Sequence, residues 1–454
     1  MSHPNQIAHI ALTGRTAMAS GGISLQRESD RYAPTGERLN TSYRRISAGG
    51  LARRTNAGVS DTATLHLSDG ADIGKSNSDF PARTTIYPRD RHIFASFSRT
   101  GAPFGRISAW GHYQSLHTEV RANNETSGVR ASVMDYGFRY AREVPSGKSL
   151  DVIWGADLYG RFDYDIVEDA QTTLRNGRET ELGAYADLRR TFDAWTLGLG
   201  ARFVHLDSRA DGVANFDNSD VIGRASVSWR APRALHFEIS ASRSITYPTL
   251  AQLHFSGTTP RGTVVGNAAL APEMARTFEL TASWQPRGAS MHVNAFDMDL
   301  DGFIDKVELA PNVETFFNGA SGRIRGLIVN ASVALGVLAV GAGYSRIRGE
   351  SDSGNPMRDI PNDEFKLSLH WQLSASHAAL TVRHRFQSNR VARSNIQADR
   401  RTLIDAAYRF RVGAPIEIEL VVRNLLNETY WVTNDRKSPL GAERSFGLGV
   451  IVEL

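Results

Sequence analysis

The stretch Ser445–Leu454 reads S-F-G-L-G-V-I-V-E-L, and it decides the interpretation of the whole chain. Every second residue is apolar, and the residues between are small or acidic, apart from Ile451. The apolar set comprises Phe446, Leu448, Val450, Val452 and Leu454. Side chains alternate between the two faces of a strand, and a lipid-facing barrel needs apolar residues outside and polar or small residues inside. The stretch therefore predicts the closing strand of a transmembrane β-barrel.

The same two-residue period recurs upstream. Apolar and polar residues alternate along 365–373, 380–387, 404–412 and 416–423, although His384 falls on the apolar face of the second segment. Each segment reads as a strand with one apolar and one polar side. Counting from the first alternating run, at about residues 8–17, we expect about 22 strands, an even number as in bacterial barrels.

Two kinds of connection alternate along the chain. Short turns are predicted at Pro145–Lys148, Ala231–Arg233, Pro286–Gly288, Leu373–Ser376 and Val412–Pro415. Long polar loops are predicted at 114–129, 163–178, 207–219, 246–274, 349–363, 387–400 and 427–443. Short turns on one rim and long loops on the other are typical of outer-membrane barrels, so the fold class is all-β, an antiparallel up-and-down barrel with short periplasmic turns and long extracellular loops.

Composition agrees with this class. The chain has 454 residues, 41% of them apolar, and a mean hydropathy of -0.31. It lacks the run of roughly 20 apolar residues that a spanning helix needs. We find no linker or charge block, so we expect one barrel domain over residues 1–454. The formal net charge of +4 is mild and no basic run occurs, so no nucleic-acid partner is expected.

The N-terminal segment has neither the basic region nor the long apolar region of a signal peptide. We therefore expect no signal peptide within this chain. The absence of cysteine suits passage through an oxidising periplasm.

Several stretches resemble the barrel domain of TonB-dependent outer-membrane receptors. They are S-A-S-R-S-I-T-Y-P-T-L-A-Q-L (240–253), Gly266-Asn267 with Leu270, Pro272-Glu273 and Phe278-Glu279-Leu280, Phe317-Asn318 with Gly322 and Gly326, Asp359-Ile360-Pro361, and N-L-L-N-E-T-Y (424–430). Each motif alone is weak, whereas their order and spacing over 240–454 are specific.

The resemblance implies an outer-membrane receptor that takes up a scarce solute such as an iron–siderophore, haem, cobalamin or a similar metal chelate. It also implies three kinds of partner: the outer-membrane bilayer, the small-molecule chelate, and a plug with the TonB energy-coupling system. Three features depart from the family. Gly326-Leu327-Ile328 stands where the family has G-x-E, the last residue is Leu454 rather than an aromatic one, and no plug domain is recognised.

Aromatic residues stand just before several short turns. They are Tyr140, Phe192, Trp229, Trp284, Trp371, Tyr408 and Phe410. Their common position predicts an aromatic girdle at one membrane interface.

One stretch fits a calcium-loop pattern. Asp297, Asp299, Asp301 and Glu308 satisfy D-x-D-x-D-G-x5-E, with Gly302 at the position of the sharp turn. The pattern requires a helix on each side, but a hairpin turn and a strand precede it and Pro311 follows. We therefore predict no metal site and no cofactor, with this calcium loop as the minor alternative.

Other polar residues carry no motif. The inward arginines Arg383, Arg385, Arg409, Arg411 and Arg423 are interpreted as wall residues that pair with Glu417, Glu419 and Asp405, in preference to a path for anions. The histidines show no metal-ligand spacing, and His254 lies in a long loop where it could meet haem or a chelate. No nucleophile motif is present, so we expect no enzyme activity.

Two other functions compete with the receptor. A passive, porin-like channel has the same wall pattern. A soluble β-propeller also repeats at about 40 residues, although its signatures are missing. The identity of the solute does not follow from the sequence, because the loops determine it.

Overall fold

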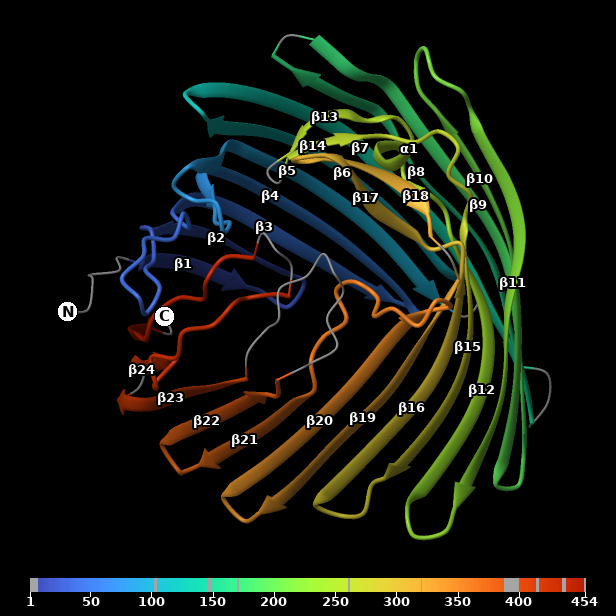
Figure 1. Ribbon diagram of the computed structural model, residues 1–454. Helices are drawn as coiled ribbons and strands as arrows, with labels where there is room; N and C mark the ends of the chain where they lie inside the picture. The colour runs from blue at the N-terminus through green and yellow to red at the C-terminus, as the bar shows by residue number, and fades with distance from the viewer. Residues whose placement is uncertain are drawn as a thin grey trace.

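The computed structural model describes residues 7–101, 104–145, 149–169, 171–259, 262–319, 321–387, 400–413, 416–434 and 438–452. One antiparallel sheet of 21 strands curls into a tall, tilted wall around a central space (Figure 1). Each strand pairs with the next barrel strand along the chain, from β1 with β2 to β24 with β25. This up-and-down order confirms the predicted all-β class.

The barrel strands share this meander and differ mainly in length. They are β1 Ile7–Arg15, β2 Ala19–Glu28, β3 Tyr43–Asn56, β4 Val59–Lys75, β5 Arg83–Gly101, β6 Gly105–Ala122, β7 Glu125–Pro145, β8 Leu150–Glu168, β9 Gln171–Phe192, β10 Trp195–Arg209, β11 Phe216–Ala231, β12 Leu235–Thr246, β15 Glu273–Trp284, β16 Ala289–Asp301, β19 Gly322–Leu335, β20 Leu338–Ser351, β21 Glu364–Gln372, β22 Ser376–Arg385, β23 Arg401–Gly413, β24 Ile416–Arg423 and β25 Ser445–Val452.

Four short strands and one short helix lie in the connections. They are α1 Leu250–His254, β13 Ser256–Thr259, β14 Gly262–Val265, β17 Ile304–Ala310 and β18 Val313–Asn318. Among the described residues, no helix has the length and apolarity needed to cross a lipid bilayer.

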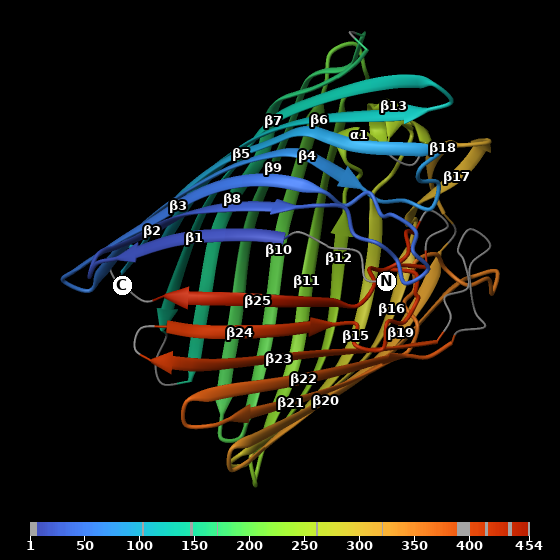
Figure 2. The ribbon, with the colours of Figure 1, turned by 90° about the vertical axis from the view of Figure 1, so that its left-hand side faces the viewer.

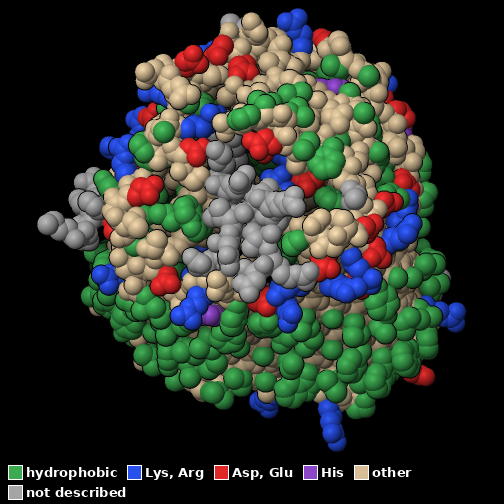
Figure 3. Space-filling view, in the orientation of Figure 1, with side chains coloured by type: hydrophobic (Ala, Val, Ile, Leu, Met, Phe, Trp, Pro, Cys, Tyr) green, Lys and Arg blue, Asp and Glu red, His purple; other side chains and the backbone are tan. Residues whose placement is uncertain are grey.

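The outer face of the wall is apolar. Paired positions carry the apolar residues to the same side on neighbouring strands, as with Leu420 opposite Leu448 and Leu280 opposite Ala295. Leu280 is 43% exposed and Leu448 is 71% exposed, so these outward side chains do not belong to a core of the described residues. Figure 3 shows the result as an apolar band across the lower part of the face in view, with mixed charges above it.

Short turns and long connections lie on opposite rims. The predicted turns at Ala231–Arg233, Pro286–Gly288 and Leu373–Ser376 join neighbouring strands on the rim at the bottom of Figure 1. The loops predicted at 207–219, 246–274, 349–363 and 427–443 lie on the other rim, with somewhat different bounds. The predicted turns at Pro145–Lys148 and Val412–Pro415 and the predicted loop at 387–400 lie partly outside the described residues, which omit 146–148, 388–399 and 414–415.

Two predicted long loops are wrong. Residues 114–129 belong mostly to β6 and β7, which are joined by Asn123 and Asn124 alone, both with positive φ (53° and 65°). Residues 163–178 belong mostly to β8 and β9. These strands extend beyond the apolar band. There the loop after β12 buries apolar residues of the wall such as Val129, Ile166 and Leu174, so the period of apolar outward and polar inward residues disappears. A loop that was not predicted, 29–42, connects β2 and β3.

The sheet does not close on itself. The sheet has 21 strands, where about 22 were predicted. No pairing joins the described residues of β1 to those of β25. β1 and β25 lie side by side with both arrowheads at the same end (Figure 2). The alternation predicted for Phe446, Leu448, Val450 and Val452 is present in β25, whereas Glu453 and Leu454 are outside the described residues.

The predicted aromatic residues gather on the outer face close to the short turns. Trp229 stacks between Trp195 and Phe237, with ring centroids 5.8 Å away on each side. Tyr140 meets the edge of Trp154 at 5.4 Å, and Tyr408 stacks on Phe410 at 5.5 Å. This ring of aromatic side chains has the position of the expected girdle.

On the inner face, bulky rings lie over glycines of the adjacent strand. A Cβ on Gly326 would overlap the ring of Phe296 directly opposite, and one on Gly137 would overlap the indole of Trp110. The glycines therefore let the rings lie flat against the wall.

We expect Gly326→Val to lower the free energy of unfolding by about 1–3 kcal/mol, because Phe296 must leave its position. Gly341→Val is the matched control, since the nearest atoms to a Cβ there are 3.9 Å away. Urea unfolding of the detergent-folded protein, followed by tryptophan fluorescence, measures both. Equal midpoints for the two variants would contradict the packing described.

Candidate functional site

A short helix stands at the mouth of the barrel. Thr249 caps α1: its hydroxyl accepts a hydrogen bond from the Gln252 backbone N–H (3.2 Å), and its own N–H donates to the Gln252 side chain (2.8 Å). This capping box satisfies two backbone donors at the start of the helix and favours a helix of even five residues. Figure 1 shows α1 inside the ring of strands.

α1 docks on the inner wall through apolar side chains. Leu250 and Leu253 are 0% and 2% exposed. Leu250 lies against β9, with its Cδ1 3.4 Å from the place that a Cβ on Gly177 would take. On the next strand, β10, Val204 and Leu206 are also buried. A second group, Val129, Ile166, Leu174 and Phe255, forms a core between the loop and β7–β9. The loop after β12 is thus a folded part of the mouth.

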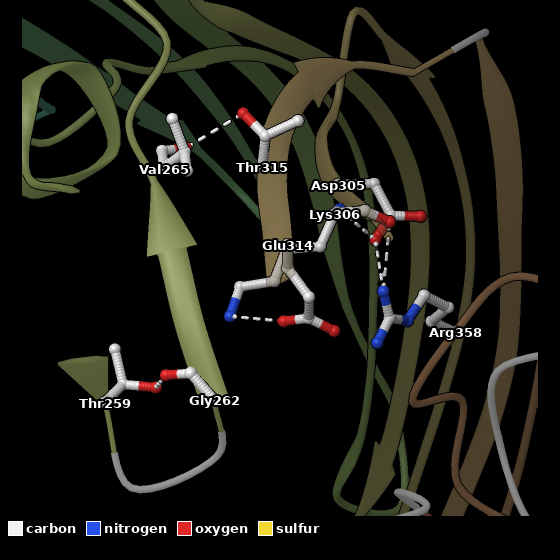
Figure 4. Close-up of polar contacts among 8 residues, drawn as sticks. All are labelled: Thr259, Gly262, Val265, Asp305, Lys306, Glu314, Thr315 and Arg358. Atoms are coloured by element: carbon white, nitrogen blue, oxygen red, sulfur yellow. Dashed lines mark hydrogen bonds and ion pairs between the residues drawn. The ribbon is translucent and has the colours of Figure 1, made fainter. Parts of the chain in front are cut away.

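Two loops join in a small sheet within the mouth, here called the mouth sheet: β13, β14, β18 and β17, in that order. β14 comes from the loop after β12 and pairs in parallel with β18, which comes from the loop after β16. The Thr315 hydroxyl donates to the Val265 carbonyl at 2.8 Å, and Lys306 Nζ lies 3.2 Å from Glu314 Oε2 (Figure 4).

Further contacts anchor the mouth sheet. Arg83 of β5 donates to the Thr259 carbonyl (2.8 Å). Arg358, in the loop after β20, donates to the Lys306 carbonyl (3.1 Å) and lies 3.5 Å from Asp305 Oδ1 (Figure 4). The loop after β24 adds Asn434, which donates to the Ile360 carbonyl at 3.2 Å. Loops from distant parts of the chain therefore hold one another in place.

The residues that carry the sequence resemblance are largely these ties. Asn318 Nδ2 donates to the carbonyls of Ala271 (2.8 Å) and Gly302 (2.7 Å), and its Oδ1 accepts from the Ala271 N–H (2.8 Å). Asn267 donates to the Phe316 carbonyl (2.9 Å). The asparagine motifs near 267 and 318 thus join the two loops of the mouth sheet.

The N-L-L-N-E-T-Y motif has a similar role. Asn424 is 5% exposed, has a φ of 49°, and donates to the carbonyls of Glu428 (3.0 Å) and Ala442 (3.1 Å). The Arg401 guanidinium lies 4.5 Å from the ring centroid of Tyr430. These contacts fix the loop that leads into β25.

The lumen wall carries paired charges. The predicted pairing of the inward arginines is confirmed for Arg383 with Asp405 (2.9 Å) and for Arg409 with Glu419 (2.8 Å). The side chain of Asp157 is fully buried, and its carboxylate accepts hydrogen bonds from both terminal nitrogens of Arg202, at 2.6 and 2.7 Å. The wall is therefore polar and its charges are paired at these positions, which suits water and polar solutes.

The wall also contains a histidine group that the sequence did not reveal. His66, His92 and His112 line one hollow of the inner face with Phe94 and Trp110. His92 Nδ1 lies 3.0 Å from His112 Nε2, and the rings are parallel within 3°. The signal was present in the strand parity, because all three are inward positions on three successive strands, β4 to β6.

Two titratable side chains of the mouth are partly buried without a polar partner among the described residues. His254 ends α1, and its Nε2 is enclosed without a hydrogen bond. Burial lowers the pKa of the His254 imidazole. Burial also raises the pKa of Tyr247 to about 12. Both groups are therefore neutral near pH 7.

The residues of the calcium pattern form strands. Asp297, Asp299 and Asp301 alternate along β16, and Glu308 is on β17. Arg323 binds the Asp297 carboxylate, and Arg325 lies 3.4 Å from it. Within the described ranges, no group of three or more His, Cys, Asp or Glu side chains could hold a metal ion. The segment thus lacks both flanking helices and a set of free carboxylates.

Comparison with known proteins agrees with this geometry. The family described as "TonB dependent receptor-like, beta-barrel" matches residues 13–425. The structure resembles a copper transporter, OprC, with a TM-score of 0.80 at 14% identity, covering 98% of this chain and 79% of that one. It also resembles the FrpB iron transporter of Neisseria meningitidis, with a TM-score of 0.74 at 13% identity, covering 98% and 79%.

A third similar structure is the Serratia marcescens haemophore receptor HasR in complex with HasA and haem, with a TM-score of 0.72 at 14% identity, covering 97% and 78%. At these identities the structural likeness concerns the fold alone. The match to the family is broad, and the chain belongs to the TonB-dependent receptor-like β-barrel family.

We expect Leu250→Ala to weaken the docking of α1 by about 2–5 kcal/mol, because Leu250 is fully buried and the cavity stays unfilled. Hydrogen exchange of residues 247–255 should accelerate while the barrel strands stay protected. Leu309→Ala is the control, since Leu309 of β17 is 60% exposed. Unchanged exchange in the Leu250 variant would contradict the packing of α1 on the wall.

Docking of α1 should also depend on pH. Since the pKa of His254 is lower in the docked state than in the open state, the open state binds more protons at low pH. Docking is therefore strongest above the ordinary histidine pKa of about 6.5 and weakens as the pH falls through it. Hydrogen exchange of residues 249–255 at pH 7.5 and 5.5, corrected for intrinsic rates, measures this, and His254→Gln should remove the difference. A pH dependence that survives in that variant would assign the effect to another group.

Proposed function

We propose that this chain is the translocation barrel of an outer-membrane receptor that takes up a scarce metal chelate. The loops of the mouth capture the solute and the polar lumen passes it through the membrane. The apolar band and the aromatic side chains near the short turns support the membrane location, because lipid-facing barrels need both.

The observation that carries the proposal is the construction of the mouth. A passive pore needs an open path, whereas here α1 and the mouth sheet extend into the ring of strands, and the Asn318 side chain ties the two loops together. A rigid, concave group of loops is what a binding site for a small solute requires, since preorganisation limits the entropy lost on binding.

The class of solute is proposed from the similar structures. Their names give copper, iron and haem, and a further one is a ferripyoverdine receptor. Metal chelates are therefore the first probes to use. Uptake against a gradient would need a plug and the TonB system, which we propose as partners in keeping with the family.

A passive channel is the second candidate. Two observations favour it. The lumen wall is polar, and no separate folded domain among the described residues fills the lumen. A soluble propeller is no longer a candidate, because the strands form one 21-stranded sheet rather than four-stranded blades.

Binding and conductance together test the proposal. Purified protein is titrated with Cu²⁺, a ferric hydroxamate, a ferric catecholate and haemin, and tryptophan quenching is recorded. We expect saturable binding of one probe. Asn318→Ala should weaken that binding about tenfold or more, because it removes three hydrogen bonds between the loops.

The matched control is Asn330→Ala, on the inner face of β19 away from the mouth sheet. It should leave affinity unchanged. Absence of saturable binding for every probe, together with steady conductance in planar bilayers, would favour the passive channel instead.

A further inference from the structure

Two histidines of the lumen wall lie in direct contact. His92 of β5 and His112 of β6 both occupy inward positions, and His92 Nδ1 lies 3.0 Å from His112 Nε2. The ring planes differ by only 3°. At this separation one of the two facing nitrogens carries a proton and the other accepts it. Two basic nitrogens of the wall therefore share one proton.

The far nitrogen of each ring faces a carboxylate. His92 Nε2 lies 2.9 Å from Asp90 Oδ1. His112 Nδ1 lies 3.8 Å from Asp135 Oδ2. A carboxylate behind an imidazole holds the ring proton on the far nitrogen, orients the ring and leaves the near nitrogen free to bind a metal ion. Both rings therefore direct a potential metal ligand to the same point.

The histidine pair borders open space. A hollow of about 540 Å³ is lined by His66, Phe94 and Trp110 together with His92 and His112. Within the described part of the chain, no group of three or more His, Cys, Asp or Glu side chains has the arrangement of a metal site. The pair therefore supplies two ligands, and the hollow leaves room for water or a small chelator at the other positions of an ion.

The charges around the pair cancel. Arg45 Nη2 lies 3.9 Å from Asp90 Oδ2. Arg161 Nε lies 3.3 Å from Asp135 Oδ1. Because each carboxylate also faces an arginine, a cation at the pair would be held by coordination rather than by a negative field. Imidazole nitrogens suit copper, nickel and zinc, whereas Ca²⁺ and Mg²⁺ prefer oxygen ligands.

We propose that His92 and His112 bind one divalent transition-metal ion, Cu²⁺ or Ni²⁺, at the lumen wall. With metal–nitrogen bonds of about 2.0–2.1 Å, two nitrogens 3.0 Å apart subtend an angle of about 95° at the ion. Neighbouring corners of the square-planar geometry of these ions have nearly this angle. The ion takes the place of the shared proton, which is released to water, and each ring turns its near nitrogen toward the ion. The site depends on the wall alone, so it holds for a receptor and for a passive channel alike.

Copper titration of the untagged, detergent-folded protein tests the site. All samples carry His3→Ala, so that a histidine next to the amino terminus does not compete for copper. We expect one Cu²⁺ per protein, with an electron paramagnetic resonance spectrum that shows coupling to two nitrogens. His92→Gln and His112→Gln should each weaken binding about tenfold or more and remove the two-nitrogen pattern. Excess Ca²⁺ should not compete.

His292→Gln is the matched control. His292 has an inward position on β16, where its partners on the adjacent strands are Ser283 and Asn330 rather than a second histidine. Its replacement should leave the affinity and the spectrum unchanged. An unchanged two-nitrogen spectrum in His92→Gln, or no binding of Cu²⁺ and Ni²⁺ by the parent protein, would overturn the proposal.

Chemical modification tests the same pair without altering it. The side chains of His92 and His112 are 27% and 25% exposed, so diethyl pyrocarbonate should reach them, and mass spectrometry locates each modified ring. We expect Ni²⁺ to protect both rings and to leave His292 reactive. Equal modification of the pair with and without Ni²⁺ would contradict the site. Because Asn318→Ala acts at the mouth and these probes act at the wall, failure of one proposal does not decide the other.

Discussion

One constraint shapes this molecule: backbone N–H and C=O groups that face an apolar surrounding must bond to each other. A sheet meets this requirement within its ladders and fails only at its edges. Within the described residues, the 21 antiparallel strands satisfy it along their ladders, and β1 and β25 each leave one edge unpaired in the sheet. The outer residues are then free to be apolar and the inner ones polar, which produces the period of two that runs from Ile10 to Val452.

The inner face obeys a different requirement. Charges there are paired, as with Arg202 and Asp157, and glycines such as Gly326 accept rings from the adjacent strand. At the mouth the inner wall carries buried apolar residues such as Val204 and Leu206, and α1 packs beside them on β9 through Leu250. The side chains of Asn267 and Asn318 then tie loops from distant strands together. The loops are thereby rigid enough to present a site, which is the physical basis for proposing a receptor.

The sequence predicts the features that depend on the period of two. Strand faces, the short turns and the class of barrel follow from it, and so does the pairing of Arg409 with Glu419. The period disappears where strands leave the apolar band, so the extensions of β6 to β9 read as loops and the Asn123-Asn124 turn stays hidden. The His66–His92–His112 group is also hidden, because its members come together only through strand pairing. Val204 and Leu206 carry a readable signal, since apolar residues at both parities in 203–206 indicate a wall covered on its inner side.

The most direct test of the account is a spin-label scan along β24, with single cysteines at each position from Ile416 to Arg423 in lipid vesicles. If the outer face contacts lipid and the inner face contacts water, oxygen accessibility should peak at Ile416, Ile418, Leu420 and Val422. Accessibility to a water-soluble nickel complex should peak at the positions between. Equal accessibility at neighbouring residues, or the opposite phase, would contradict a barrel with a lipid-facing outer wall.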